Sequence, residues 1–130
     1  MPCEITWEEH GVYKRFSGMV SYAEYRRSQE RVLADARTDS LRYIINDASA
    51  MEGFLGTTDD AEESAAFNYA TSLSNPAMRI AFVTSDFRLI AMVKVASVLS
   101  SFPLKCFATL EAARAWAMEG LPPTRAASAT

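Results

Sequence analysis

Residues 78–100, MRIAFVTSDFRLIAMVKVASVLS, place a short run of apolar and β-branched residues directly before a helix signal. Met78–Thr84 is predicted to be a buried strand, because short, mostly apolar runs of this kind are typical of strands covered on both faces. Ser85 and Asp86 can cap the free amides of a helix that runs from Phe87 to Ser100. A strand followed at once by a helix favours an α/β fold.

A similar strand and helix precede this pair. Leu41–Asn46 reads Leu-Arg-Tyr-Ile-Ile-Asn and is predicted to be a second buried strand. A helix is expected to start near Thr57–Asp60, where Thr and Asp cap amides and acidic residues suit the positive end of the helix dipole. It ends before Pro76. The segment between strand and helix contains Gly53 and Gly56 and is predicted to be a loop.

The N-terminal part predicts a hairpin followed by the first helix. Cys3–Glu8 and Val12–Ser17 are expected to be its strands, and Gly11 supplies the backbone freedom that a tight turn needs. Gly18 is predicted to end the second strand. Ser21–Glu24 has the capping-box pattern, in which the serine and the glutamate satisfy amides of the first helical turn.

The C-terminal part predicts one more strand, Lys105–Ala108, and a last helix, Leu110–Met118. The element order is therefore β-β-α-β-α-β-α-β-α, which predicts a mixed, mostly parallel five-stranded sheet with four helices. Residues 1–119 are expected to form one domain. Residues 120–130, rich in small residues and proline, are expected to form a flexible tail.

The composition excludes some functions. The chain has 130 residues and a net charge of −3, with a pI near 5.1. An acidic protein is not expected to bind nucleic acid. Three arginines, Arg26, Arg27 and Arg31, alternate with acidic residues, as on a solvated helix face. No apolar stretch is long enough for a transmembrane segment.

The sequence predicts neither a metal site nor a cofactor. The chain has two isolated cysteines, Cys3 and Cys106, and a single histidine, His10, and these residues lack the spacing of a closed zinc site. No leader of charged and apolar residues is visible, so a cytoplasmic location with reduced thiols is expected. A bridge between the two cysteines stays open, because the sequence does not show whether they are close.

Four stretches, ITWEEHGVYKRFSGMVSYAEY, LRYIINDAS, NPAMRIAFVTSD and CFATLEAARAWA, resemble the SpoIIAA-like family, which is related to STAS and Sec14-type lipid-binding domains. The resemblance spans about Cys3–Ala117. Its most specific parts are Asp47 at a strand end and a closing Phe-x-Thr-x-x-x-Ala-x-x-Trp pattern that ends at Trp116. The resemblance implies a SpoIIAA/STAS-like fold and a non-enzymatic role in binding protein partners, often anti-sigma factors, or small ligands.

The resemblance also raises a phosphorylation switch. In the anti-sigma antagonists of the wider group, a serine that follows an aspartate at the start of the second helix is phosphorylated. The matching residues here, Gly56–Asp59, contain no Asp-Ser pair. Thr57 or Thr58 is either a substitute acceptor or a helix cap, and both interpretations stay open.

Polar residues follow the predicted strands and precede the predicted helices, where α/β proteins bind ligands. The candidates for a ligand or partner site are Asp47, Ser49, Thr57, Thr58 and Asp86. The competing interpretation is that each of them caps a helix or closes a turn. The carboxylates of Asp47 and Asp86 could in principle do acid–base chemistry. The sequence does not give their separation, and no metal-ligand spacing accompanies them, so no catalytic residue is predicted.

The helix from Phe87 is apolar on almost every side and must be covered by other groups. It is interpreted as packed deeply in the core, as a surface for self-association, or as the wall of an apolar pocket with Met92. In the third case Phe54 and Leu55 would form a mobile lid on their loop.

Two functions follow from these interpretations. The first is a binding or regulatory module that acts through protein–protein contacts, with a second copy or a regulatory protein as partner. The alternative is a carrier or sensor of a small apolar or lipid-like ligand, which predicts a pocket of about 300 Å³ or more.

Overall fold

Five strands form one sheet in the order of the sequence. The computed structural model describes residues 3–72, 75, 77–99 and 103–122. Its strands are β1 (Cys3–Trp7), β2 (Gly11–Ser21), β3 (Tyr43–Leu55), β4 (Arg79–Val83) and β5 (Leu104–Phe107). β1 pairs with β2 antiparallel, and the remaining pairs are parallel. The mixed, mostly parallel sheet expected from the sequence is confirmed.

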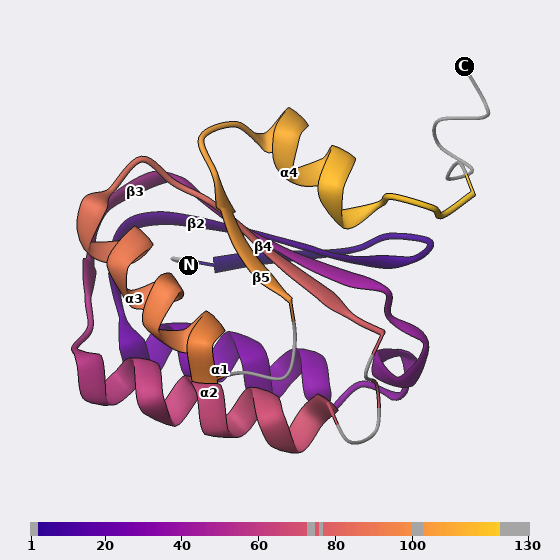
Figure 1. The fold of residues 1–130 in the computed structure, drawn as a ribbon, viewed down its shortest axis with the longest axis horizontal. Helices are drawn as coiled ribbons and strands as arrows, with labels where there is room; N and C mark the ends of the chain where they lie inside the picture. The colour runs from indigo at the N-terminus through magenta and orange to yellow at the C-terminus, as the bar shows by residue number, and fades with distance from the viewer. Residues whose placement is uncertain (1–2, 73–74, 76, 100–102, 123–130) are drawn as a thin grey trace.

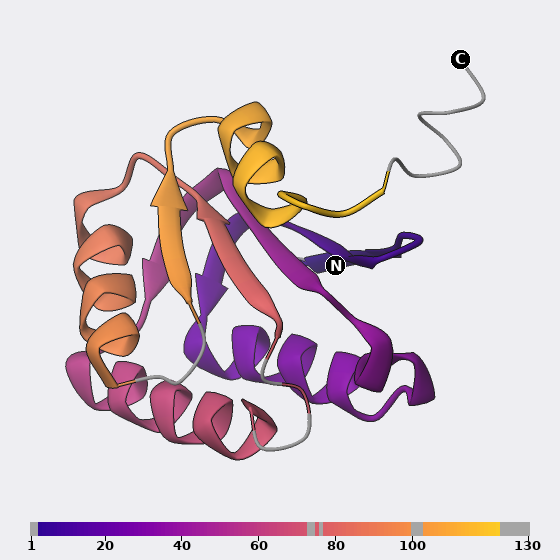
Figure 2. The same cartoon turned by 45° about the vertical axis from the view of Figure 1, so that its right-hand side comes forward.

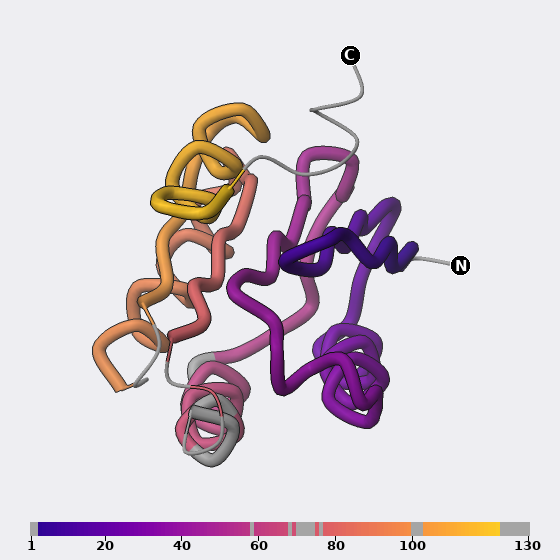
Figure 3. Tube along the Cα trace, turned by 90° about the vertical axis from the view of Figure 1, so that its right-hand side faces the viewer, coloured from indigo at the N-terminus to yellow at the C-terminus, as the bar shows by residue number. Residues whose placement is uncertain are grey.

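Helices cover both faces of the sheet unequally (Figures 1 and 2). α1 (Tyr22–Leu33), α2 (Thr58–Ser72) and α3 (Phe87–Leu99) lie on one face. α4 (Leu110–Ala117) lies on the other, as the end-on view of Figure 3 also shows. A single turn of 3₁₀ helix, Ala36–Ser40, follows α1 and was not predicted. The sheet therefore separates two apolar cores, a large one under α1–α3 and a small one under α4.

Alternation along β2 divides its side chains between the two cores. Val12, Phe16 and Val20 belong to the large core, and Tyr13 packs against the small one. Since side chains on a strand alternate between faces, Lys14 shares the face of Val12 and Phe16. This places a lysine on the side of the sheet that α1–α3 cover.

The paired part of β2 and β3 is longer than the sequence predicts. β2 continues past Gly18, which has a φ of +69° and stays within the strand instead of ending it. β3 continues through Gly53 to Leu55, so the predicted loop is strand. The two extensions pair with each other, with register shifts on either side of Ser17–Gly18. Each segment looks irregular alone, and the partner strand supplies the hydrogen bonds that make it a strand.

Gly11 is required for a different reason than the sequence suggested. Its φ is not in the left-handed region. A Cβ built on Gly11 would lie 2.4 Å from the ring of Tyr43, which is fully buried. The Tyr43 hydroxyl donates to Glu8 at 2.5 Å, and Arg114 on α4 holds the same carboxylate through two bonds of 2.8 and 2.9 Å. Gly11 therefore makes room for a ring that ties the hairpin to α4.

Two further expectations concern the ends of the chain. Cys3 and Cys106 are free thiols on β1 and β5, the opposite edge strands, so the open possibility of a bridge is excluded. The last helix ends where it was expected to, and Gly120 follows it with a φ of +79°. Most of the predicted flexible tail, residues 123–130, and the predicted helix end at Ser100 lie outside the described residues.

Candidate functional site

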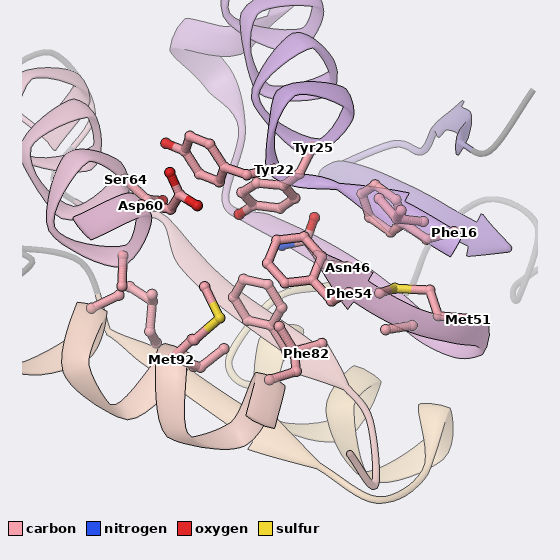
Figure 4. A pocket seen from close by; sticks show the side chains of 17 residues that line it. Phe16, Tyr22, Tyr25, Asn46, Met51, Phe54, Asp60, Ser64, Phe82 and Met92 are labelled. Carbon is pink, nitrogen blue, oxygen red and sulfur yellow. The ribbon is translucent and has the colours of Figure 1, made fainter. Parts of the chain in front are cut away.

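An apolar cavity of about 50 Å³ lies between the sheet and the three helices α1–α3 that cover one of its faces. Figure 4 shows the side chains that surround it. Its walls include Phe16, Tyr25, Met51, Phe54, Phe82 and Met92. The cavity lies where the sequence placed a pocket, between the helix from Phe87 and residues 51–55. Its volume is well below the roughly 300 Å³ of common ligand pockets.

Tyr25 of α1 is the centre of this aromatic cluster. Its ring centre lies 5.9 Å from that of Phe16, 6.3 Å from Phe54 and 6.2 Å from Phe82. The Phe54 contact is edge-to-face, an arrangement that aromatic pairs favour. Burial raises the pKa of the Tyr25 hydroxyl, so that the ring stays neutral at physiological pH. The hydroxyl is the hydrogen-bond partner of the Gln29 amide at 3.3 Å.

Asn46 introduces a polar group into this apolar wall. It lies on β3, and its side chain is only 1% exposed. In Figure 4 its amide lies beside the ring of Tyr25. Its Oδ1 atom has no hydrogen-bond partner among the described residues. A buried carbonyl oxygen without a hydrogen-bond partner destabilises the folded state, and such atoms are rare in native structures.

Lys14 is the neighbour of Asn46 across the strands, on β2. Its side chain is 1% exposed, yet no carboxylate of the described residues forms an ion pair with it. Its Nζ donates to the Ser28 hydroxyl at 3.1 Å and lies 5.2 Å from the centre of the Tyr25 ring. Burial lowers the Lys14 pKa to about 8, an effect that the nearby Cys3 opposes in part.

The two residues share a second, smaller cavity of about 20 Å³, which Gln29 and Tyr25 also line. Asn46 and Tyr25 therefore belong to the walls of both cavities. The larger cavity is apolar apart from a few groups, and the smaller one contains a cation and two amides. Together they form a site with one polar end and one apolar end.

Asp47, the strongest candidate from the sequence, is held by its neighbours. Its carboxylate accepts from the Tyr13 hydroxyl at 2.5 Å and from the Ser49 hydroxyl and amide at 2.6 and 3.0 Å. Burial would raise the Asp47 pKa, but the bonds from Ser49 and Tyr13 outweigh it and keep the pKa below its usual value. Asp47 thus points to the α4 side, away from the apolar cavity. It lies within β3, where the register with β2 shifts, and not at the end of a strand as expected.

Asp86 and Ser49 come together at the ends of the strands. Both line a cleft of about 190 Å³ that also includes Thr84 and Ser85, and Asp47 is not part of its walls. Asp86 Oδ1 accepts from the amide of Arg88 at 2.8 Å, as an N-terminal cap of α3 does. The cap interpretation therefore accounts for the contacts of Asp86, and the cleft stays a candidate ligand site.

Thr57 caps α2. Its hydroxyl accepts from the Asp60 amide at 3.2 Å, and the Asp60 carboxylate accepts from the Thr57 amide at 2.9 Å. This reciprocal pair is a capping box with Asp in place of Glu. The side chain of Thr58 lies outside the described residues. No contact tests whether either threonine is phosphorylated, so that suggestion stays a prediction.

The apolar candidates divide between the cavity and the surface. Phe54 and Met92 line the cavity, and Leu55 is 60% exposed and does not. Phe54 and Leu55 lie on β3, so the mobile lid expected on a loop is wrong. Gly56 fits between Phe54 and Met92, because a Cβ there would lie 2.4 and 2.8 Å from their side chains.

Lys14 and Asn46 were not among the residues predicted from the sequence. The signal that could have found Lys14 is the alternation of Val12, Lys14 and Phe16, which puts a charge on an otherwise apolar face. Asn46 is the last residue of the predicted strand and follows Ile44 at a spacing of two. The same alternation assigns its side chain to the face of Ile44, in the large core.

Within the part of the chain that the structure describes, no three His, Cys, Asp or Glu side chains gather into a metal site. Among the same residues, no helix is both long and apolar enough to cross a membrane.

The fold has relatives among solved structures. An uncharacterized protein of the DUF3478 family from Shewanella loihica, which has a SpoIIAA-like fold, is 15% identical, with a TM-score of 0.53 over 88% of this chain and 90% of that one. The anti-sigma factor antagonist SpoIIAA in its unphosphorylated form is 12% identical, with a TM-score of 0.60 over 90% of this chain and 98% of that one. No curated protein matches the chain.

These similarities extend through the sheet and its helices, and at such low identity they show the fold alone. The family model is the more specific finding, because it matches residues 12–118, which contain four of the five strands and all four helices. This chain belongs to the SpoIIAA-like family.

Proposed function

We propose that this chain is a non-enzymatic protein-interaction module of the STAS type, and that its partner docks on the outer face of α3. The observation that carries the proposal is the exposure of apolar side chains on that helix. Phe87 is 87% exposed, Val98 83% and Leu99 52%. The opposite side of α3 is buried through Leu89, Val93 and Ala96. Exposed apolar patches of this kind mark interaction surfaces.

The surroundings of α3 support a protein partner. A groove of about 510 Å³ runs between α3 and the edge strand β5, lined by Ile90, Lys94 and Cys106 among others. Edge strands present unpaired backbone groups that a partner can use. The resemblance to an anti-sigma factor antagonist is in keeping with a regulatory partner. The contacts of Asp47, which fix its carboxylate within β3, and of Asp86, which cap α3, support a role without catalysis.

A second copy of the chain is the partner to test first. An apolar stripe along one helix is self-complementary, so two copies can bury it against each other about a twofold axis. Wild-type protein is expected to sediment as a dimer. The double variant Phe87→Glu/Val98→Glu is expected to weaken the dimer about 100-fold or more, because it places a charge at each end of the exposed apolar face of α3.

Sedimentation equilibrium over a wide concentration range measures this effect. Met19→Glu is the matched control, because Met19 is 51% exposed but lies on β2. It is expected to leave the dimer unchanged. A wild-type dimer that the double variant does not weaken would contradict docking on α3. A monomer at all concentrations would leave only a regulatory protein as partner.

The second candidate function is a carrier or sensor of a small apolar ligand. The position of the apolar cavity supports it, and the cavity volume, well below the roughly 300 Å³ that this function predicts, counts against it. The cavity wall is built from Phe54, Phe82 and Met92 beneath α3. At about 50 Å³ the cavity has to widen before it can hold more than a few atoms of a ligand. Binding there would not require the exposed face of α3, so both functions can belong to one domain.

A further inference from the structure

Lys14 is a buried cation, and few of the groups around it stabilise its charge. Its ammonium group has three N–H donors, and among the residues that the structure describes it has one hydrogen-bond partner, the Ser28 hydroxyl at 3.1 Å. That hydroxyl donates its own hydrogen to the Tyr25 carbonyl at 2.6 Å, so it receives the lysine through a lone pair. The rings of Tyr25 and Phe16, at 5.2 and 5.8 Å, supply the remaining contacts. A charge buried without a counter-ion lacks the pairing that buried charges usually have.

Asn46, on the neighbouring strand β3, also has a buried polar atom without a hydrogen-bond partner among the described residues. Lys14 and Asn46 are paired across the parallel strands β2 and β3, whose backbones lie about 4.8 Å apart. The Asn46 Oδ1 nevertheless has no partner among the described residues, so the amide and the ammonium do not satisfy each other. A side-chain amide can present either its oxygen or its NH₂ group by a half turn. The pair can therefore receive an oxygen-bearing group between them.

The space next to this pair is adjacent to the apolar cavity, and the side chains of Asn46 and Tyr25 line both. The cavity of about 20 Å³ that both residues line is large enough for a small polar group. Asn46 and Tyr25 also belong to the wall of the larger cavity, whose other walls include Phe54, Phe82 and Met92. A molecule bound here would meet a cation and an amide at one end and aromatic rings and a thioether along its length.

We propose that the Lys14–Asn46 pair binds the carboxylate of a small, unbranched carboxylic acid whose apolar chain occupies the cavity beneath α3. The carboxylate supplies the missing counter-ion and accepts hydrogen bonds from the ammonium and from the amide NH₂. The chain buries apolar surface against Phe54 and Phe82. The inference rests on the second candidate function, because it needs that cavity, and it is independent of docking on α3.

Titration calorimetry with a series of straight-chain acids, butanoate, hexanoate and octanoate, tests the proposal. Wild-type protein is expected to bind at least one of them, and to bind it more tightly than the alcohol of the same chain length. Lys14→Met is expected to weaken carboxylate binding about tenfold or more, because it removes the charge and keeps the shape of the side chain. Asn46→Leu is expected to weaken it as well.

Lys105→Met is the matched control, because Lys105 is an exposed lysine on β5. It is expected to bind the acid as wild type does. Equal affinity of wild type and Lys14→Met for the acid would overturn the proposal. If acids and alcohols bind alike to every variant, the polar pair is wrong and the apolar carrier survives. If no compound of the series binds wild type, the proposal fails and the carrier function loses its support.

Discussion

Replacing Lys14 with methionine is expected to raise the free energy of unfolding at pH 7 by about 3 kcal/mol. Burial lowers the Lys14 pKa from its ordinary 10.5 to about 8, and each unit of difference corresponds to about 1.4 kcal/mol between the two protonation states. Methionine has nearly the same shape and needs no counter-ion. A substitution in the middle of the large core would then stabilise the protein, which few core substitutions do.

The gain is expected to depend on pH. The unfolded chain keeps the Lys14 proton up to about pH 10.5, and the folded chain loses it near pH 8. Between these values the unfolded state binds more protons, so the stability of wild type rises with pH in this window. The advantage of the variant is therefore full below pH 8 and disappears by about pH 10.5. Cys3 on β1 and Tyr25 on α1, the titratable groups that face Lys14, are present in both proteins.

Denaturant unfolding of both proteins at pH 7 and pH 10 measures the difference. Lys105→Met is again the control, and its effect is expected to stay within about 1 kcal/mol, as for most exposed positions. A loss of stability in Lys14→Met at pH 7 would show that the ammonium is better compensated than the contacts of Ser28 and Tyr25 indicate. If Lys14→Met stays more stable than wild type by the same amount at pH 10, the added stability comes from packing and not from removal of the charge.

Gly11→Ala is expected to destabilise the fold by about 3 kcal/mol. The new Cβ would lie 2.4 Å from the Tyr43 ring, and overpacking a core typically costs about 1 to 3 kcal/mol. The ring cannot easily move away, because its hydroxyl is bonded to Glu8, which Arg114 holds in turn. Thermal or denaturant unfolding measures this loss.

Gly18→Ala provides the comparison for Gly11→Ala. Gly18 has a positive φ, but nothing lies within 4 Å of its added Cβ. Its cost is expected to be only about 1 kcal/mol, from backbone strain. The double variant Gly11→Ala/Tyr43→Leu removes the ring that the new Cβ meets, and it is expected to recover part of the lost stability. Equal effects of the two glycine substitutions would show that Gly11 is needed for its backbone and not for space.

The fold could be predicted from the sequence because its elements are marked locally. The capping box at Ser21 and the apolar run Arg79–Val83 each identify an element without knowledge of the rest. The second half of β3 could not be predicted in this way. It contains Ser49, Glu52 and Gly53, and it is a strand because β2 lies beside it.

The candidate site was predicted only in part for a related reason. The sequence drew attention to Asp47, where strands end, and to the apolar helix α3. Phe54 and Met92, two of the predicted residues, line the cavity beneath that helix. Lys14 and Asn46 come from two strands far apart in sequence, and only the register of β2 with β3 makes them neighbours. A charge that looks solvated in a short hairpin strand becomes buried once α1 packs over it.

A buried, poorly compensated lysine is a feature that a purely structural core would lose readily. Natural proteins keep destabilising groups where function needs them. The stability that Lys14 costs and the carboxylate that it is proposed to bind are two consequences of one arrangement. A ligand that binds only the folded state would stabilise it in proportion to its occupancy.

The most direct test is the titration of Lys14 itself by NMR, using protein labelled at the lysine side chains. The chain has only three lysines, and the Lys14→Met variant identifies the signal. The signal is expected to titrate near pH 8 in the free protein. In the presence of the acid that binds most tightly, it is expected to titrate well above that value, because a bound carboxylate favours the ammonium. A signal that titrates near pH 10.5 and does not respond to the acid would contradict the claim that Lys14 is a buried cation that binds an anionic ligand.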